Sequence, residues 1–267
     1  MNNAEITRSV RSVLEWEQEL PALNSLMSAV RGGTAETDLS PTAAICFDSN
    51  VFLNLGKGSR ADEVIDYLGK KHAGPIVLPS QVILELWNNH LTGIDAYVSR
   101  LSRQFEELNK TVEEIDPQYS GLKDGAKTLA RDFQEEFGYV FNEKTRTDLL
   151  ALLDMLTKTA IVSQLPRAEF SQVASLRKRT KTPPGFKDNG DGDFFVWAEF
   201  LQGLLLARTS GKDFDRALLV TDDVKKDWSK NGTPHPILSA ELYALVEVPF
   251  GVMTLSELKG AVQRALA

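Results

Sequence analysis

The sequence has very few residues of the kinds that form disulfides or zinc sites. Its 267 residues include one cysteine, Cys46, and three histidines. One cysteine excludes an intramolecular disulfide, and because Cys46 lies in an apolar run we expect it to be a small core residue rather than a nucleophile. The histidines lack the spacing of metal ligands. A zinc centre is therefore not expected, and the cysteine usage fits a reducing compartment.

Long apolar runs are also lacking. No run approaches the roughly 20 residues of a membrane span, and the first residues carry no apolar signal segment, so we expect a cytoplasmic protein with no membrane partner. Known catalytic loops are absent as well. There is no G-x-x-x-x-G-K-[ST] loop, no G-x-S-x-G turn, no dinucleotide fingerprint after the first strand and no cysteine–histidine pair.

Positive charge is scarce relative to negative charge, and the net charge is −7. This balance argues against a protein that coats nucleic acid through electrostatics alone, because such proteins are usually basic. It does not exclude a nuclease, since divalent cations bound by converging carboxylates would reverse the local sign. With 42% hydrophobic residues, the chain can form one large α/β domain or two small ones.

The first half of the chain alternates short apolar strands with amphipathic helices. We place two helices, interrupted at Pro21, in an N-terminal helical segment, residues 1–40. An apolar strand at 43–47 then leads to a helix capped by Ser59. The strand "PIVLP" follows and leads to the helix "SQVILELWNNH", capped by Ser80. The β-α-β-α order predicts a central parallel sheet with helices on its faces.

Long charged amphipathic segments occupy residues from about 93 to 182, with no convincing strand. We interpret them as a helical insertion within a domain spanning 41–267. The sheet pattern resumes after "TPPGFKDNGDGD" with an apolar helix at 194–207, the strand "ALLV" and a last strand near "ALVEVP".

Acidic residues stand where a parallel sheet would gather them. They follow the first strand, follow "ALLV", lie between apolar residues of a helix, or open the apolar helix: Asp48, Glu85, Asp191, Asp193, Asp222 and Asp223. Ligands of such sheets bind beyond the carboxyl ends of the strands. Taken alone, Asp193 or Asp222 could equally be a helix N-cap, and Glu85 could be exposed or paired with an arginine.

Taken together, these acids indicate a cation site. Carboxylates on neighbouring elements repel one another unless a positive charge lies between them. Hard oxygen ligands suit Mg²⁺ or Mn²⁺. Two such ions would align a water for attack on a phosphodiester, which requires no nucleophilic side chain.

Four segments resemble PIN-domain nucleases in their order along the chain: "FDSNVFLNL", "PSQVILELW", "GDFFVW" and "VTDDVKKDW". With "PPGFKD", they are similar to the larger bacterial PIN-like branch, which has a helical insertion before its third acid. The resemblance covers residues 43–258. It implies an α/β/α sandwich and metal-dependent endonuclease activity, most often on RNA.

The resemblance also implies the site residues. Metal and water would be held by Asp48, Glu85, Asp193 and Asp222, with Asp223 as a possible substitute for Asp222 and Asn50 shaping the first loop. Asp188 and Asp191 compete with Asp193 for the third position, and we favour Asp193 because it directly precedes the apolar helix.

A basic stretch, "RKRTKTPPGFK", lies just before the third acid. If it borders the site, its side chains would bind nucleic-acid phosphates: Arg177, Arg179, Lys181 and Lys187. The alternative is a solvated basic loop. Lys225 and Lys226 are weaker candidates for the same role, and we expect Trp87, Trp197 and Trp228 to be core residues rather than stacking platforms for bases.

Two other functions remain open from the sequence. One is a Rossmann-like phosphatase with Asp48 as nucleophile, although "DSN" lacks the second acid of such enzymes. The other is a non-catalytic PIN-like scaffold whose insertion binds a partner protein. An inhibitor protein, a homo-oligomer and the choice of RNA or DNA also remain open.

Overall fold

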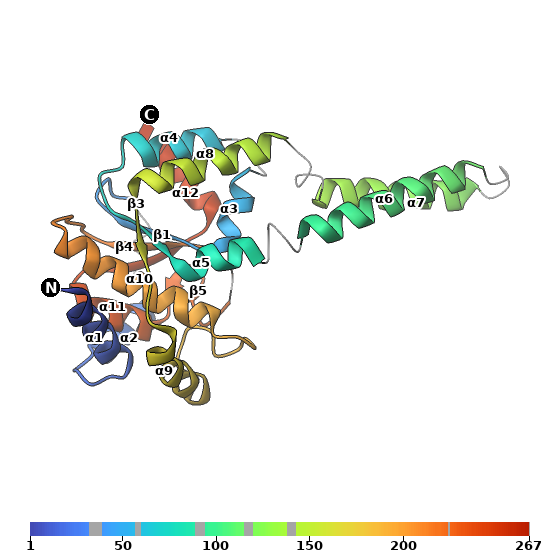
Figure 1. Ribbon diagram of the computed structural model, residues 1–267. Helices are drawn as coiled ribbons and strands as arrows, with labels where there is room; N and C mark the ends of the chain where they lie inside the picture. Colours follow the sequence, from blue (N-terminus) through green and yellow to red (C-terminus); the bar gives the residue numbers. More distant parts are fainter. Residues whose placement is uncertain are drawn as a thin grey trace.

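A five-stranded parallel sheet forms the centre of the molecule (Figure 1). The computed structural model describes residues 1–31, 39–56, 60–88, 94–114, 120–137, 143–223 and 225–266. The strands lie in the order β3-β2-β1-β4-β7. Their bounds are β1 Ala44–Phe47, β2 Ile76–Pro79, β3 Ala160–Ser163, β4 Ala217–Val220 and β7 Phe250–Met253.

Four of the strands are buried along their whole length and are almost entirely apolar, as expected for parallel strands covered on both faces. The chain runs outward from β1 through β2 to β3, then returns to the other side of β1 as β4. In the β1–β4 pair, Phe47 lies opposite Val220. Asp48 and Thr221 therefore leave the sheet side by side at the point where the strand order reverses, which is where open α/β sheets bind ligands.

Helices cover both faces of the sheet (Figure 1). One layer contains α3 Ser49–Gly56, α4 Ala61–Lys70, α8 Glu143–Thr159 and α12 Leu255–Leu266. The other contains α1 Asn3–Leu14, α2 Ala22–Val30, α9 Arg167–Thr180, α10 Gly192–Thr209 and α11 Pro236–Val246. Helix α5, Ser80–Glu85, follows β2 and contacts α3 and α10. The predicted α/β/α sandwich with a central parallel sheet is confirmed.

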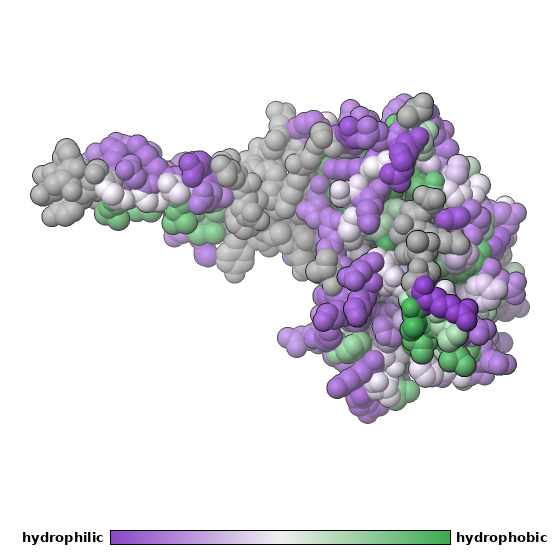
Figure 2. Space-filling view, turned by 180° about the vertical axis from the view of Figure 1, so that it is seen from behind, coloured by the Kyte–Doolittle hydropathy of each residue, from purple (hydrophilic) through white to green (hydrophobic). Residues whose placement is uncertain are grey.

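Two long helices, α6 Ile94–Glu113 and α7 Ser120–Phe137, pair as a hairpin that projects from the body (Figure 1). The rings of Phe105 and Phe133 lie 4.8 Å apart between them. Figure 2 shows hydrophilic residues along one side of the projection and apolar residues along the other. No helix among the described residues is long and apolar enough to cross a membrane.

Three predictions about elements are wrong. The stretch expected to contain no strand holds β3, which pairs with β2; its residues are only partly buried, so they lack the apolar pattern of a central strand. The segment "ALVEVP" ends α11, and the last strand begins after it at Phe250. Ser80 does not cap α5, because its hydroxyl donates to Glu199. Ser59 lies outside the described residues.

A buried ion pair joins the N-terminal helices to the core. Arg177 Nη1 lies 2.6 Å from Glu241 Oε1 and also donates to the carbonyl of Leu14. The Glu241 carboxylate accepts from the indole nitrogens of Trp16 and Trp197 as well. The Arg177 side chain is 4% exposed. The prediction that Arg177 contacts nucleic acid is therefore wrong, since its guanidinium is enclosed and both Nη atoms bind groups of the protein.

Candidate active site

The Asp48 carboxylate is held by three short hydrogen bonds at the carboxyl end of β1. Its Oδ1 accepts from the Ser49 backbone at 2.6 Å, and its Oδ2 accepts from Thr221 Oγ1 at 2.7 Å and from Asn50 Nδ2 at 2.8 Å. Asn50 also accepts from the backbone of Asp222 at 3.1 Å. Asn50 thus links the loop after β1 to the loop after β4, and the Asp48 carboxylate is fixed in one orientation.

Glu85 reaches the same edge of the sheet from the end of α5. Its Oε2 accepts from Ser49 Oγ at 3.2 Å, and its Oε1 accepts from Gln81 Nε2 at 2.7 Å. The first turn of α10 lies against it, because a Cβ added at Gly192 would be 2.5 Å from Oε1. A side chain at position 192 would therefore require the Glu85 carboxylate to shift.

Lys225 lies among three further carboxylates. Its Nζ is 2.8 Å from Asp188, 3.0 Å from Asp223 and 3.2 Å from Asp193. Asp193 also accepts from the indole nitrogen of Trp228. The ammonium group therefore provides the positive charge that a cluster of acids requires.

Burial changes the acid–base properties of this cluster. Desolvation first, and then the hydrogen bond with Asp188, raise the pKa of Asp193 to about 7. Burial also raises the pKa of Asp48 and of Glu85. Although burial lowers the pKa of Lys225, its bonds to Asp188 and Asp223 raise it well above its usual value. Lys225 is therefore charged, while Asp193, Asp48 and Glu85 retain protons more readily than in water.

The two adjacent acids after β4, Asp222 and Asp223, have different partners. The Asp222 carboxylate accepts from Asn54 Nδ2 at 2.9 Å and from the backbone of Leu255, the first residue of α12, at 3.0 Å. It therefore caps α12, whereas the ion pairs of Lys225 within the described structure are with Asp188, Asp193 and Asp223. Asp223 instead pairs with Lys225, and its negative charge raises the pKa of Asp48. Asp223, rather than Asp222, is the acid after β4 that shares Lys225 with Asp188 and Asp193.

The remaining predicted residues fall into two groups. Asp188 joins the cluster through Lys225, whereas Asp191 faces Lys178 at 3.7 Å and stays outside it. The side chains of Arg179, Lys181 and Lys187 are exposed.

The tryptophans also divide. Trp197 and Trp228 are buried as predicted, but Trp87 is 60% exposed, so its assignment to the core is wrong. It lies just after the end of α5, next to the buried Leu86.

Sequence reasoning missed the polar residues that orient the acids. Such polar residues carry no signal in isolation. The bonds of Thr221 to Asp48 and of Ser49 to Glu85 form only when distant segments meet, whereas Gln81 contacts Glu85 one turn away on the same helix. A signal does exist for Glu199, a charged residue inside the apolar helix α10. Its buried carboxylate accepts from the Ser80 hydroxyl and the Gln81 backbone, and so fixes the start of α5 and the position of Glu85.

A family model described as a PIN-like domain matches residues 127–239. The matched part includes Asp193, Lys225 and the two acids that follow β4. The chain carries a PIN-like domain. The match supports the PIN-like superfamily predicted from the sequence, and the fold is of the nuclease type. No curated protein and no solved structure gives a match.

The PIN-like domain offers oxygen donors of the kind that Mg²⁺ and Mn²⁺ prefer. Among the residues that the structure describes, no three acidic, histidine or cysteine side chains are arranged to hold an ion as they stand. Lys225 accounts for this arrangement, because its ammonium bridges three of the acids. The donor set therefore fits a divalent cation in its chemistry, and binding one requires an exchange of partners at Lys225.

Without metal, the PIN-like domain is expected to lose stability as the pH rises from about 4 to about 7. Unfolded aspartate has a pKa of about 3.9, and the folded pKa of Asp193 is about 7. In this window the folded state keeps a proton that the unfolded state releases, so unfolding becomes easier as the pH rises. The lowered pKa of Asp188 acts below the window. Melting temperatures measured in EDTA should fall across the window, and Asp193→Asn should flatten the curve; parallel curves for the two proteins would contradict the assignment.

Proposed function

We propose that this protein is a metal-dependent endonuclease that hydrolyses phosphodiester bonds of RNA. The observation that carries the proposal is the convergence of four carboxylates from four separate elements at the reversal point of the sheet: Asp48, Glu85, Asp193 and Asp223. Such an arrangement is unfavourable unless a cation answers it. A site that binds a metal ion would make use of this concentration of negative charge.

These four residues would hold Mg²⁺ or Mn²⁺. When bound, such ions lower the pKa of a water and stabilise the oxygen that leaves a phosphodiester. The chain contributes orientation: Thr221 and Asn50 hold Asp48, while Ser49 and Gln81 hold Glu85. Because these bonds exist before any ligand arrives, little reorganisation of the two carboxylates is needed.

Exposed cations that precede Asp188 and Asp193 in the sequence support a nucleic-acid substrate. Arg179 lies in the last turn of α9, and Lys181 and Lys187 lie on the segment between α9 and α10. Contacts to phosphates would provide affinity independent of sequence. Arg177 is excluded from this group by its burial.

The proposal is tested by incubating the protein with labelled single-stranded RNA or DNA in Mg²⁺, in Mn²⁺ or in EDTA. Cleavage is expected with metal and absent with EDTA. Internal cuts, rather than stepwise loss from an end, would support an endonuclease. Cleavage that survives EDTA would overturn the metal requirement, and preference for DNA would overturn the choice of RNA.

The two acids after β4 provide a matched pair of variants. Asp223→Asn should lower kcat/KM by at least about tenfold, because it removes a proposed ligand. Asp222→Asn should have a much smaller effect, since an asparagine oxygen can still accept from the Leu255 backbone. Equal losses in the two variants, or a larger loss for Asp222→Asn, would restore Asp222 as the fourth ligand.

A non-catalytic PIN-like scaffold is the second candidate. It is favoured by Lys225, whose ammonium already bridges three acids, and by the apolar side of the α6–α7 hairpin, which includes the exposed leucines Leu101, Leu108, Leu122 and Leu129. Absence of cleavage with every nucleic acid and metal, together with retained folding, would favour this candidate.

A further inference from the structure

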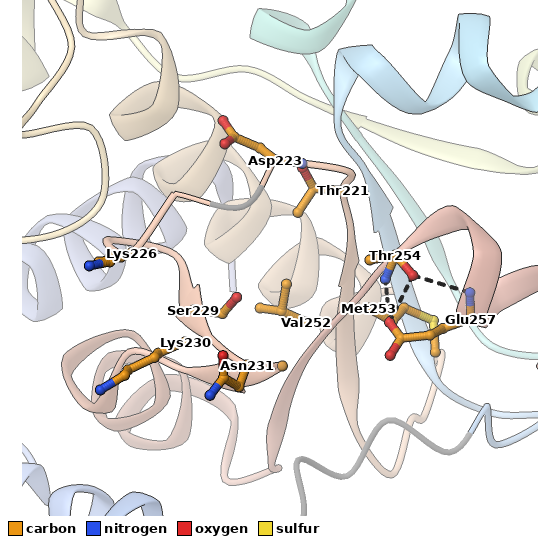
Figure 3. Close-up of a pocket in the computed structure, with 11 residues that line it drawn as sticks. Thr221, Asp223, Lys226, Ser229, Lys230, Asn231, Val252, Met253, Thr254 and Glu257 are labelled. Carbon is orange, nitrogen blue, oxygen red and sulfur yellow. Dashed lines mark hydrogen bonds between the residues drawn. The ribbon is translucent and has the colours of Figure 1, made fainter.

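A pocket of about 320 Å³ opens beside the acid cluster (Figure 3). It lies between a small hairpin, β5 Ser229–Lys230 and β6 Thr233–Pro234, and the turn from β7 into α12. Thr221 and Asp223 line it on one side, and these residues contact Asp48 and Lys225 respectively. The pocket is therefore continuous with the candidate active site.

Two lysines mark the hairpin side of this pocket. Lys226 and Lys230 are both exposed, and their ammonium groups extend from the same side of the pocket in Figure 3. Neither makes an ion pair or a side-chain hydrogen bond with any residue that the structure describes. Lys225, one position earlier, is instead bound to three carboxylates. Lys225 and Lys226 are consecutive but have different environments: Lys225 is bound by carboxylates, whereas Lys226 is available to a ligand.

The pocket interior suits a flat, partly polar group. Val252 and Met253, which are almost fully buried, line its base, and Ser229 and Asn231 line it on the hairpin side. Asn231 and Gly232 both have positive φ, which closes the tight turn of the hairpin. On the opposite side, the Glu257 carboxylate accepts from the backbone and hydroxyl of Thr254. Its charge is engaged there, away from the lysines.

We propose that this pocket holds one nucleotide unit of a single-stranded polynucleotide, next to the phosphodiester at the acid cluster. The inference rests on the proposed function for the identity of that neighbouring site. The volume is near the lower end of ligand pockets, roughly 300–1,000 Å³, which suits one nucleotide rather than several. The base lies over Val252, and the backbone phosphates follow Lys226 and Lys230.

A binding measurement tests this proposal independently of catalysis. Fluorescently labelled single-stranded RNA, and DNA of the same sequence, are titrated against Asp48→Asn protein with and without Lys226→Ala and Lys230→Ala. The double lysine substitution should weaken binding about tenfold at physiological salt. Loss of two phosphate contacts should also reduce the slope of log Kd against log salt by about 1.4. RNA and DNA should be affected alike if the lysines contact phosphates alone, and a larger effect on RNA would add a contact to the ribose hydroxyl.

Lys212→Ala is the matched control, because Lys212 is an exposed lysine in the loop between α10 and β4. It should leave both the affinity and the salt slope unchanged. Equal affinities for the double variant and its parent would overturn the pocket, even if the protein cleaves RNA. Weakened binding in a protein that cleaves nothing would retain the pocket and overturn the nuclease instead.

A second measurement locates the base directly. RNA carrying 4-thiouridine is irradiated on Asp48→Asn protein, and crosslinked peptides are identified by mass spectrometry. Crosslinks in the peptide that contains Ser229 or in the one that contains Val252 are expected. Crosslinks confined to the α6–α7 hairpin would overturn the proposal.

Discussion

Asp48→Asn is expected to reduce the rate of RNA cleavage by at least about 100-fold. Mutation of residues that merely orient metal ligands typically costs 10–100-fold, so neutralising a central ligand should reach or pass the upper end of that range. The asparagine also places an amide nitrogen where Thr221 and Asn50 donate hydrogen bonds to a carboxylate oxygen. Both the charge and the orientation at the end of β1 are lost.

The measurement for Asp48→Asn combines activity with metal binding. Mn²⁺ should raise the melting temperature of the wild type, and the increase should shrink in the variant. Asp213→Asn is the control, since the Asp213 side chain is 94% exposed and pairs only with Arg208 in the described structure. Wild-type cleavage by Asp48→Asn would rule out the proposed site, whatever the outcome with Asp213→Asn.

Arg177→Ala is expected to lower the free energy of unfolding by about 3–5 kcal/mol, the usual cost of removing one partner of a buried ion pair. The substitution leaves the Glu241 carboxylate fully buried, and among the described residues its remaining side-chain partners are the indole nitrogens of Trp16 and Trp197. It also removes the donor to the Leu14 carbonyl at the end of α1. The packing of α1 and α2 on the core should loosen as a result.

Urea denaturation measures this effect, and Arg179→Ala is its control. Arg179 lies two residues away on the same helix but is exposed, so its substitution should change stability by less than about 0.5 kcal/mol. For RNA affinity the opposite is expected: Arg179→Ala should weaken binding more than Arg177→Ala, because Arg179 is a proposed phosphate contact. Similar stabilities for the two variants would show that the Arg177–Glu241 pair contributes little.

The sheet and its acids could be predicted because they depend on local patterns. Short apolar strands between amphipathic helices are visible in the sequence, and an aspartate that ends such a strand is conspicuous, as at Asp48. The edge strand β3 was not visible because half-buried residues follow α8 without a break. Position in the sheet, rather than intrinsic preference, makes that segment a strand.

Side-chain orientation was beyond the reach of sequence patterns. Asp222 and Asp223 are adjacent and chemically identical, yet one caps α12 and the other pairs with Lys225. Their difference depends on where Leu255 and Lys225 lie in space. Arg177 was misassigned for the same reason, since a basic run does not reveal which member turns inward to a buried glutamate.

The pairing of β1 with β4 determines the reach of every side chain in the site. Residues along a strand are about 3.3 Å apart, so a register shift of one residue would separate Thr221 from the Asp48 carboxylate by more than a hydrogen bond can span. An insertion or deletion within either strand would therefore disable the site without changing any acid. The register of this strand pair, with Phe47 opposite Val220, therefore determines how the side chains of the candidate active site are aligned.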